Sequence, residues 1–349
     1  MSDWHWKRLE NPWRATHDTK AVWALSEWRD HLYLGTRNLK DGGEILRSSD
    51  GEHWEDLIEP GFDNRHNHDI YGLVAFRGML YAGTYNGIHR GLEPSLPVTG
   101  GQVWRSRDGR DWQCVVDDGF GDQHNQDIFN LAAFGDHIYV GTFNPDSGAE
   151  IWRSDDGTQW HRVFKAESNQ QDYVRAFAIM ADKLYASGGK LSPFALYETD
   201  DGLNWTDVVR GRMPERLTDG MRVAVVDDVL IASLAQWRTG PVEIWRYAQD
   251  SWDLISEPGF GFPENQLAGA MAVDHDRVVL ATENEKTGTQ VWLCDDPRNP
   301  SWRQINESGF GDSRNALCVF GTRWFRDRLY VGTATNASDW SAQLWVGTD

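Results

Sequence analysis

The sequence has few cysteines and no long apolar run, and each of these absences excludes a class of protein. Its 349 residues contain three cysteines, Cys114, Cys294 and Cys318, which are far apart and form no Cys-x-x-Cys pair. A disulfide framework or a cysteine zinc site is therefore not expected. No stretch approaches the roughly 18 consecutive apolar residues of a membrane-spanning helix, so a membrane protein is not expected either.

Basic residues are also under-represented. The chain has 53 Asp and Glu against 34 Lys and Arg, which gives a formal net charge of -19. Such a field repels a phosphate backbone and an anionic bilayer, so neither nucleic acid nor a membrane is an expected partner. Residues 1–13 lack the basic start, apolar stretch and small-residue cleavage site of a secretory signal. We therefore expect a cytoplasmic protein.

The signatures of several enzyme classes are missing as well. The sequence has no Gly-rich phosphate loop, no Gly-x-Ser-x-Gly and no His-Glu-x-x-His. Nucleotide-dependent transfer, α/β-hydrolase chemistry and metalloprotease chemistry therefore lack support.

Internal repetition is what the sequence has in abundance. The phrase Leu-Tyr-x-Gly-Thr and its close variants begin at 32, 80, 138, 184, 230, 278 and 329. A period of roughly 50 residues is typical of propellers and solenoids. Within one period, four short runs rich in β-branched and aromatic residues are separated by Gly or Asp turns. An insertion at 87–101 accounts for the one longer step.

The repeat predicts an all-β fold, a seven-bladed β-propeller of four-stranded blades. The last unit stops after its third strand, at 342–349, while residues 4–10 match the outer strands of other units. We expect the N-terminal strand to complete the C-terminal blade, which closes the ring and makes residues 1–349 one domain. The predicted blades begin near Lys20, Ile70, Ile128, Tyr173, Met221, Leu267 and Leu317.

A second phrase, Ser-x-Asp-Gly-x-x-Trp, falls on the turn between the third and outer strands. Asp accepts backbone N–H bonds there, Gly supplies a positive φ and Trp covers the joint, so we interpret the phrase as a local staple and not as a catalytic signature. Its copies are Ser48, Asp50, Gly51 and Trp54; Ser106, Asp108, Gly109 and Trp112; Ser154, Asp156, Gly157 and Trp160; and Thr199, Asp201, Gly202 and Trp205.

These four copies resemble the Asp-box, or BNR-repeat, propellers, although the box is one residue shorter than the family's Ser-x-Asp-x-Gly-x-x-Trp. The resemblance implies a propeller fold. Because that group includes sialidases, xyloglucanases and a photosystem II assembly factor, the resemblance implies no particular reaction. The Phe-Arg-Ile-Pro phrase of sialidases is absent from this sequence.

A Gly-Phe loop follows the outer strand in four units, at 59–64, 117–122, 257–262 and 307–312. Glycine for the bend and phenylalanine packed between blades account for this phrase. The Asp-rich loops leave Ca²⁺ or another divalent metal open as an alternative, because hard cations prefer oxygen ligands. No cofactor is strongly implied.

The upper ends of the inner strands differ between blades. One half of the ring carries carboxylates and aromatic residues, whereas the other half carries small and apolar residues such as Ala268, Ala270 and Cys318. Converging buried carboxylates have pKa values shifted toward acid–base work. We therefore expect a single ligand site with catalytic residues Asp69, Asp127, Tyr173, Arg175 and Asp219, walled by Trp23, Tyr71 and Phe129.

The neighbouring loops add polar residues to this site. His66, His68 and His124 are predicted ligand contacts, with metal ligation, a proton relay or simple solvation as alternatives. Asn86, Asn144 and Lys190 begin the loops after the second strands and are also predicted ligand contacts. Capping of strand ends is the alternative role for such asparagines.

Two functions follow from this site. The first is an enzyme acting on a small, partly aromatic or apolar molecule, a hydrolase or lyase in which Asp69 or Asp127 is the base and Arg175 and Tyr173 stabilise negative charge. In type it is similar to the propeller part of cyclophane-forming alkylating enzymes, a similarity that carries over no residue. The second is a scaffold that binds a glycan or a protein through tryptophans such as Trp237 and Trp340. Lectin propellers repeat their binding residues in every blade, so the uneven distribution here favours the enzyme.

Overall fold

The computed structural model describes most of the chain and shows an all-β protein. Besides strands, the described residues form only three short 3-10 helices, η1 (Pro60–Phe62), η2 (Pro258–Gly261) and η3 (Ser308–Gly311). No helix in this described part is long and apolar enough to cross a membrane. The described residues are 4–10, 12–13, 18–87, 98–167, 171–189, 193–209, 212–214, 217, 219–236, 239–318, 321–336 and 340–349, of which 219–221 are described by their backbone alone.

The chain forms two compact units. Unit 1 comprises Met1–Glu10, Phe177–Glu198 and Thr206–Asp349, and unit 2 comprises Asn11–Ala176 and Thr199–Trp205. The expectation of one domain over residues 1–349 stays a prediction.

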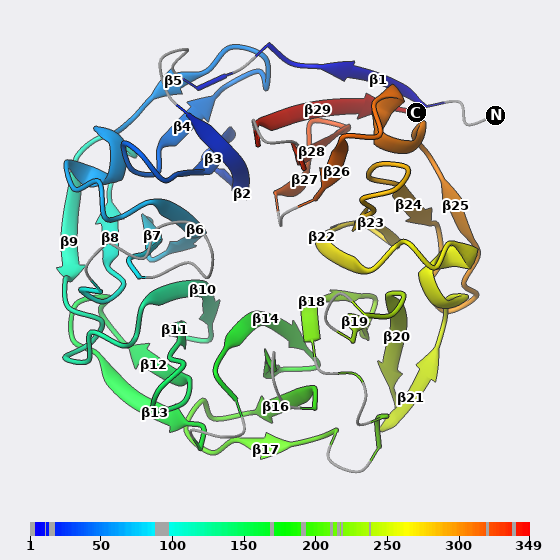
Figure 1. Ribbon diagram of the computed structural model, residues 1–349. Coiled ribbons are helices and arrows are strands. Elements are labelled where there is room, and N and C mark those ends of the chain that lie inside the picture. The colour runs from blue at the N-terminus through cyan, green and yellow to red at the C-terminus, as the bar shows by residue number, and fades with distance from the viewer. Residues whose placement is uncertain are drawn as a thin grey trace. The chain divides into compact units, whose positions relative to one another are not determined.

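Unit 2 contains one 12-stranded sheet that divides into three four-stranded antiparallel sheets, which follow one another in chain order (Figure 1). In each sheet the strands pair in sequence order, so each connection is a hairpin. The first sheet is β2 (Thr19–Trp28), β3 (His31–Asn38), β4 (Ile45–Ser48) and β5 (Glu55–Asp56); the second is β6 (Asp69–Phe76), β7 (Met79–Tyr85), β8 (Val103–Ser106) and β9 (Trp112–Val116); the third is β10 (Asp127–Phe134), β11 (His137–Phe143), β12 (Glu150–Ser154) and β13 (His161–Lys165).

Unit 1 continues the same pattern, with the first residues of β14 belonging to unit 2. Its sheets are β14 (Val174–Met180), β15 (Lys183–Gly188), β16 (Ala195–Thr199) and β17 (Thr206–Asp207); β18 (Asp219–Val226), β19 (Val229–Ala235), β20 (Glu243–Ala248) and β21 (Ser251–Leu254); and β22 (Leu267–Asp274), β23 (Arg277–Glu283), β24 (Val291–Cys294) and β25 (Trp302–Gln304).

The last sheet of unit 1 joins the two ends of the chain, as expected. Strand β1 (His5–Arg8) pairs antiparallel with β29 (Ala342–Thr348), from His5 opposite Thr348 to Arg8 opposite Trp345. Figure 1 shows these strands side by side. The inner part of this sheet is divided between β26 (Asn315–Leu317) and β27 (Thr322–Phe325), both paired with β28 (Arg328–Thr335). Counted in this way, with the 12-stranded sheet of unit 2 taken as three, the described strands form seven sheets, which is consistent with the predicted seven blades.

Packing at this junction explains its sequence. The indole Nε1 of Trp6 donates to the carbonyl oxygen of Ile305 at 2.7 Å, and its ring packs edge-on against Phe310 at 5.0 Å. A Cβ on Gly347 would lie 2.9 Å from the Trp6 ring, so glycine allows the strand to lie under the indole.

The Ser-x-Asp-Gly-x-x-Trp turns form the predicted local staple. In the second copy, Ser106 Oγ accepts a bond from the Gly109 N–H at 2.8 Å, and Asp108 Oδ1 accepts bonds from the N–H groups of Arg110 and Asp111 at 2.8 and 2.9 Å. Gly109 has φ +81°, which a side chain would strain. The other copies repeat these bonds at Gly51, Gly157 and Gly202.

The same turns also hold neighbouring sheets together, which the sequence did not reveal. Arg105 on β8 donates to the carbonyl oxygen of Asp156 in the next sheet's turn at 3.4 Å, and Arg153 on β12 donates to that of Asp201 at 3.1 Å. A Cβ on Gly157 would overlap the hydroxyl of Tyr81 on β7. Glycine is therefore needed for the contact between sheets as well as for the turn.

The Gly-Phe loops pack between sheets as predicted. Phe62 stacks on Trp104 of the next sheet with ring centroids 4.2 Å apart, and Phe120 stacks on Trp152 at 4.6 Å. In unit 1, Phe260 stacks on Trp292 at 4.5 Å. Offset stacking of this kind contributes beyond the buried area alone.

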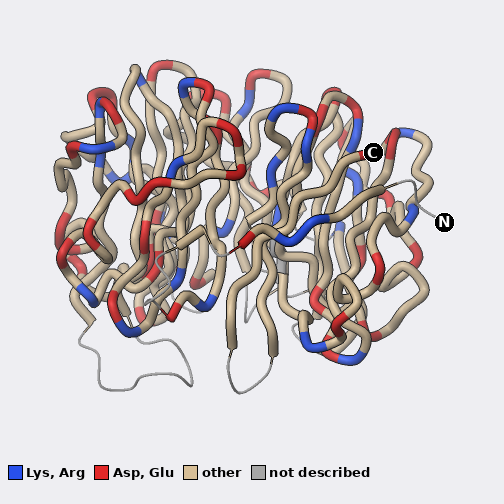
Figure 2. Tube along the Cα trace, turned by 90° about the horizontal axis from the view of Figure 1, so that it is seen from above, with Lys and Arg blue, Asp and Glu red and all other residues tan. Residues whose placement is uncertain are grey.

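Charged residues occur on many turns and loops. Figure 2 shows Asp and Glu interspersed there with Lys and Arg. The negative net charge is thus spread over many loops. Among the described residues, no group of three or more His, Cys, Asp or Glu side chains is arranged to hold a metal ion.

Candidate functional site

The ends of the inner strands in unit 2 are joined into one continuous line by backbone pairing. At the start of β6, Asp69 lies opposite both Arg37 of β3 and Tyr85 of β7. Asp127 at the start of β10 lies opposite Tyr85, and also opposite Phe143 of β11. A bridge from Phe143 to Tyr173 continues the line. The register therefore brings the predicted Asp69, Asp127 and Tyr173 onto one edge.

Asp69 forms a buried ion pair with Arg37. The guanidinium Nε donates to Oδ1 at 2.6 Å and Nη2 donates to Oδ2 at 2.7 Å, and the two residues are 1% and 0% exposed. Trp23 Nε1 also donates to Oδ1, at 3.0 Å. A bidentate pair of this kind fixes both partners in orientation. Removing either partner would leave an uncompensated buried charge.

The sequence alone did not single out Arg37. It follows Gly-Thr on the second strand, where the next two sheets have Tyr85 and Phe143. A charged residue at an otherwise aromatic position was the available signal. Its partner is not visible in the sequence, because the pairing of β3 with β6 is long-range.

Burial by itself raises the pKa of Asp69, but Arg37 and then His68 lower that pKa more strongly, so it lies well below the ordinary aspartate range. Asp69 is therefore a carboxylate anion at any physiological pH. Its charge is fixed by its neighbours, and it is poorly suited to accept a proton.

Four aromatic residues form a row beside the ion pair. Trp23 and Tyr71 have ring centroids 4.4 Å apart, Tyr71 and Phe129 are 4.6 Å apart, and Phe129 and Tyr173 are 5.6 Å apart. Trp23, Tyr71 and Phe129 are 6%, 9% and 5% exposed, whereas Tyr173 is half-buried. The predicted wall of the site is thus a packed row of rings, most of whose surface is buried.

The phenols of this cluster stay protonated. Burial is the largest cause that raises the pKa values of Tyr71, Tyr85 and Tyr173, and the negative charge of Asp127 raises all three further. Asp127 itself is 1% exposed. A neutral phenol donates a hydrogen bond, so these tyrosines are donors in the neutral pH range.

Arg175 lies against the far end of the row. Its guanidinium carbon is 4.6 Å from the ring centroid of Tyr173 and 5.8 Å from that of Phe129. Its carbonyl oxygen accepts a bond from Asn130 Nδ2 at 3.0 Å. The predicted Tyr173, Arg175 and Phe129 therefore come together in unit 2.

Two predicted catalytic or binding residues cannot be placed with this cluster. Asp219 begins β18 in unit 1, where its backbone pairs with Ala235, and its side chain is not among those described. Lys190 lies outside the described residues, as does Trp237. Trp340 is described and half-buried.

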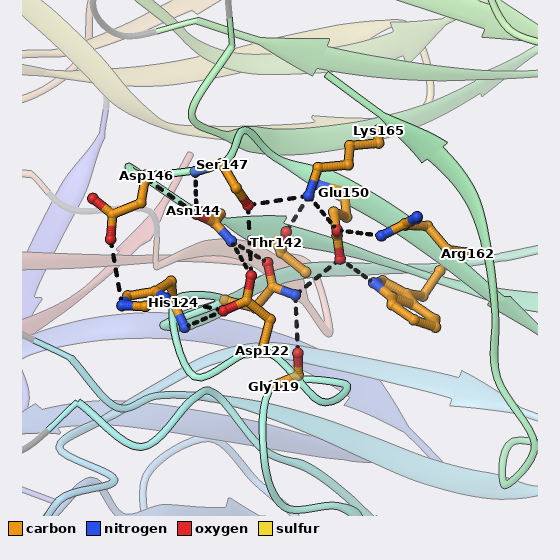
Figure 3. A network of polar contacts seen from close by, with 12 residues as sticks. Gly119, Asp122, His124, Thr142, Asn144, Asp146, Ser147, Glu150, Arg162 and Lys165 are labelled. Atoms are coloured by element: carbon orange, nitrogen blue, oxygen red, sulfur yellow. Dashed lines mark hydrogen bonds and ion pairs between the residues drawn. The ribbon is translucent and has the colours of Figure 1, made fainter. Parts of the chain in front are cut away.

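The three predicted histidines have different surroundings. His68 is buried, and its Nε2 donates to the carbonyl oxygen of Gly87 at 3.1 Å, while Nδ1 lies 3.3 Å from Asp69 Oδ2. His66 is half-buried, and its backbone N–H donates to Asn64 Oδ1 at 3.1 Å. His124 belongs to a loop network in which Nδ1 is 3.1 Å from Asp122 and Nε2 is 3.6 Å from Asp146 (Figure 3).

Asn144 and Asn86 act in the strand-capping role that the sequence left open. Asn144 Nδ2 donates to Asn125 Oδ1 at 3.0 Å, and Asn144 Oδ1 accepts bonds from the N–H groups of Asp146 and Ser147 (Figure 3). Asn86 Nδ2 donates in the same way to Asn67 Oδ1 at 3.1 Å. Both asparagines are fully buried, and a ligand contact for either stays a prediction.

Comparison with known proteins identifies the fold. The chain superposes on the WD40 repeats of RRP9 with a TM-score of 0.63 and 10% identity over 98% of this chain and 97% of that one. A polysaccharide lyase of family PL25, an ulvan lyase, gives 0.60 and 10% over 94% of each chain. An ancestral GH74 enzyme gives 0.60 and 15% over 97% of this chain. The chain therefore has a β-propeller fold.

These similarities are limited to the fold. This chain spans about half the length of the GH74 enzyme, 47% of it. No protein-family model matches the sequence, and no curated protein sequence matches it.

Proposed function

We propose that unit 2 carries the active site of an enzyme that acts on a small molecule by acid–base chemistry. The observation that carries this proposal is the fully buried Arg37–Asp69 ion pair, set beside Asp127 and a row of aromatic rings at neighbouring strand ends. Taking such charges out of water is costly, and buried charges with strongly shifted pKa values concentrate at functional sites.

In this proposal the charged residues have separate roles. Asp127 is the base, because Asp69 is already held as an anion by Arg37. Arg175 and Tyr173 stabilise negative charge that develops on the substrate. Asp69 and Arg37 fix the electric field of the site. Asp219, on unit 1, stays a predicted catalytic residue outside this cluster, to be tested separately by substitution.

The reaction class follows from these groups. A base with neutral phenol donors and a guanidinium serves a hydrolase, a lyase or an alkylating enzyme equally well. Support for an enzyme also comes from the GH74 enzyme and the ulvan lyase, which share this fold. The Asp-box resemblance supports the fold and no reaction, and the similarity to cyclophane-forming enzymes assigns no residue.

The test compares small-molecule extracts before and after incubation with the protein. The wild type should deplete one compound and produce another, as measured by mass spectrometry, whereas Asp127→Asn should slow this conversion about 10²-fold to 10⁴-fold. Arg175→Lys should also slow it, and thermal unfolding serves as the control for folding. If folded wild type and Asp127→Asn leave identical extracts, the site is not catalytic.

A second function, binding without catalysis, is favoured by one observation. The carboxylate of Asp69 is surrounded by donors from Arg37 and Trp23 and has a lowered pKa. A rigid site of this kind suits recognition of a glycan or a protein partner. In that case the extract experiment shows no product, and substitution of Trp237 or Trp340 abolishes partner binding.

A further inference from the structure

Tyr71 occupies the centre of the aromatic row. Its ring lies between those of Trp23 and Phe129, with centroids 4.4 and 4.6 Å away. Rings packed on both faces hold the phenol in one orientation. Tyr71 is 9% exposed, the most exposed of these three rings.

The hydroxyl of Tyr71 is oriented by Arg37. Arg37 Nη2 donates to Tyr71 Oη at 3.2 Å, and the same nitrogen donates to Asp69 Oδ2 at 2.7 Å. The hydroxyl therefore acts as an acceptor toward Arg37. Within the described part of the chain, no residue accepts the hydrogen that the hydroxyl itself carries. A neutral phenol can donate such a hydrogen to an acceptor oxygen.

We propose that Tyr71 is a catalytic residue that donates this hydrogen to an oxygen of the substrate, and that Arg37 is the positioning residue that aims it. The inference rests on the proposed function and names its substrate class, a molecule with a carbonyl or a leaving-group oxygen beside an apolar or aromatic group. The rings of Trp23 and Phe129 contact that group.

The proton balance of the step is closed. As the carbon–oxygen bond of the substrate breaks, its electron pair goes to the oxygen, which takes the proton of Tyr71 Oη. Asp127 accepts a proton from the attacking water or from carbon. The phenolate of Tyr71, stabilised by Arg37, then regains a proton as Asp127 releases the one it accepted.

Acetophenone labelled with ¹³C at its carbonyl is a suitable probe, because it combines an aromatic ring with an acceptor oxygen. The infrared carbonyl stretch of the bound probe should move to lower frequency in the wild type, since a hydrogen bond weakens the C=O bond. In Tyr71→Phe the shift should disappear and the affinity should fall about fivefold. Tyr81→Phe, a buried tyrosine whose hydroxyl packs against Gly157, is the matched control and should keep the shift.

Arg37→Lys tests the positioning role. It keeps the positive charge but loses the fork that contacts Asp69 and Tyr71 together, so the carbonyl shift should shrink while the probe still binds. A purely structural role for Arg37 would change the unfolding midpoint and leave the stretch of the bound probe unchanged.

Two results overturn the inference. One is an unshifted carbonyl, or no bound acetophenone, in the wild type. The other is an equal shift in the wild type and Tyr71→Phe. The extract experiment separates this from the proposed function: conversion that is lost in Asp127→Asn but kept in Tyr71→Phe preserves the enzyme and rejects Tyr71 as its proton donor. A Tyr71-dependent shift without any conversion preserves the donor and rejects the enzyme.

Discussion

The inner-strand ends of the β10 sheet in unit 2 and the β22 sheet in unit 1 share one loop structure but carry different chemistry. In unit 2, Asn125 Nδ2 donates to the carbonyl oxygen of Gly119 at 2.9 Å, and the chain reaches Asp127 two residues later. In unit 1, Asn265 makes the same bond to Gly259 at 2.9 Å, and the chain reaches Leu267. Since the same loop ends in a buried leucine elsewhere, the fold does not require a carboxylate there.

The contrast extends along the strands. Unit 1 places Ala268 and Ala270 beside Leu267, all of them almost fully buried. Unit 2 instead buries Asp69 and Asp127 among aromatic rings and arginines. Burying apolar side chains costs less free energy than burying carboxylates, because it requires no charge compensation. The carboxylates of unit 2 are therefore best explained by function.

The largest effect on stability is expected when Arg37 alone is removed, because this disrupts the buried charges that distinguish unit 2 from the apolar β22 sheet. Arg37→Met leaves Asp69 as an uncompensated buried charge, and we expect a loss of about 3–5 kcal/mol in the free energy of unfolding. Chemical denaturation measures it. The double variant Arg37→Met with Asp69→Leu, which imitates unit 1, should recover most of this loss. A single variant as stable as the wild type would show that the pair is not buried as described.

Substitution of Gly157 tests the packing between the sheets of unit 2 that carry the site. The Ser-x-Asp-Gly-x-x-Trp turns belong to these sheets. Gly157→Ala adds a Cβ at φ +73° that overlaps the hydroxyl of Tyr81, so we expect a loss of about 1–3 kcal/mol. Adding Tyr81→Phe should return part of it, as measured by urea denaturation. If the effects of Gly157→Ala and Tyr81→Phe on the unfolding free energy simply add, the two residues are not in contact between the sheets.

The ion pair should also make stability depend on pH. Because the pKa of Asp69 is lower in the folded state, its contribution is present above the unfolded value of about 3.9 and is lost as pH falls through the folded value. Between pH 4 and pH 2 the unfolding free energy of the wild type should fall more steeply than that of Arg37→Met with Asp69→Leu. If the unfolding free energies of the two proteins fall in parallel over this pH range, the pKa of Asp69 is not lowered in the folded state.

The smallest effect is expected at Glu150, which corresponds to Gln290 of unit 1. Both accept a bond from an asparagine of the preceding loop, Asn125 at 2.9 Å and Asn265 at 2.7 Å. Glu150 also binds Lys165 at 2.8 Å, with Lys165 partly exposed (Figure 3). Glu150→Gln should therefore change the unfolding free energy by less than about 1 kcal/mol in thermal or urea denaturation. A larger loss would assign the charge itself a structural role.

The repeat allowed the strands to be predicted because turn residues and hydrophobic alternation are local. The pairing of β1 with β29 was predicted from the incomplete last sheet and the matching tryptophans of residues 4–10. The boundaries were less accurate: Leu317 ends β26, although a strand was expected to begin there.

The site was predicted only in part, for physical reasons. Asp69 and Asp127 come together because both lie opposite Tyr85, and Tyr71 and Phe129 follow them by two residues on the same strands. The role of Asp69 depends on Arg37, which lies on the neighbouring strand β3. No local sequence pattern contains this long-range contact. The bonds of Asn86 and Asn144 to Asn67 and Asn125 could not be predicted either, because these partners lie 19 residues away in sequence.

The most direct test of the central claim uses Asp127→Leu, which gives unit 2 the leucine that unit 1 has at this position. The measurement is the rate at which this variant converts the compound that the wild type removes from a small-molecule extract. The account predicts a folded protein with an unfolding free energy equal to or above that of the wild type and conversion at least about 10²-fold slower. Unchanged conversion, or a variant that fails to fold, would contradict the claim that this carboxylate serves function and not the fold.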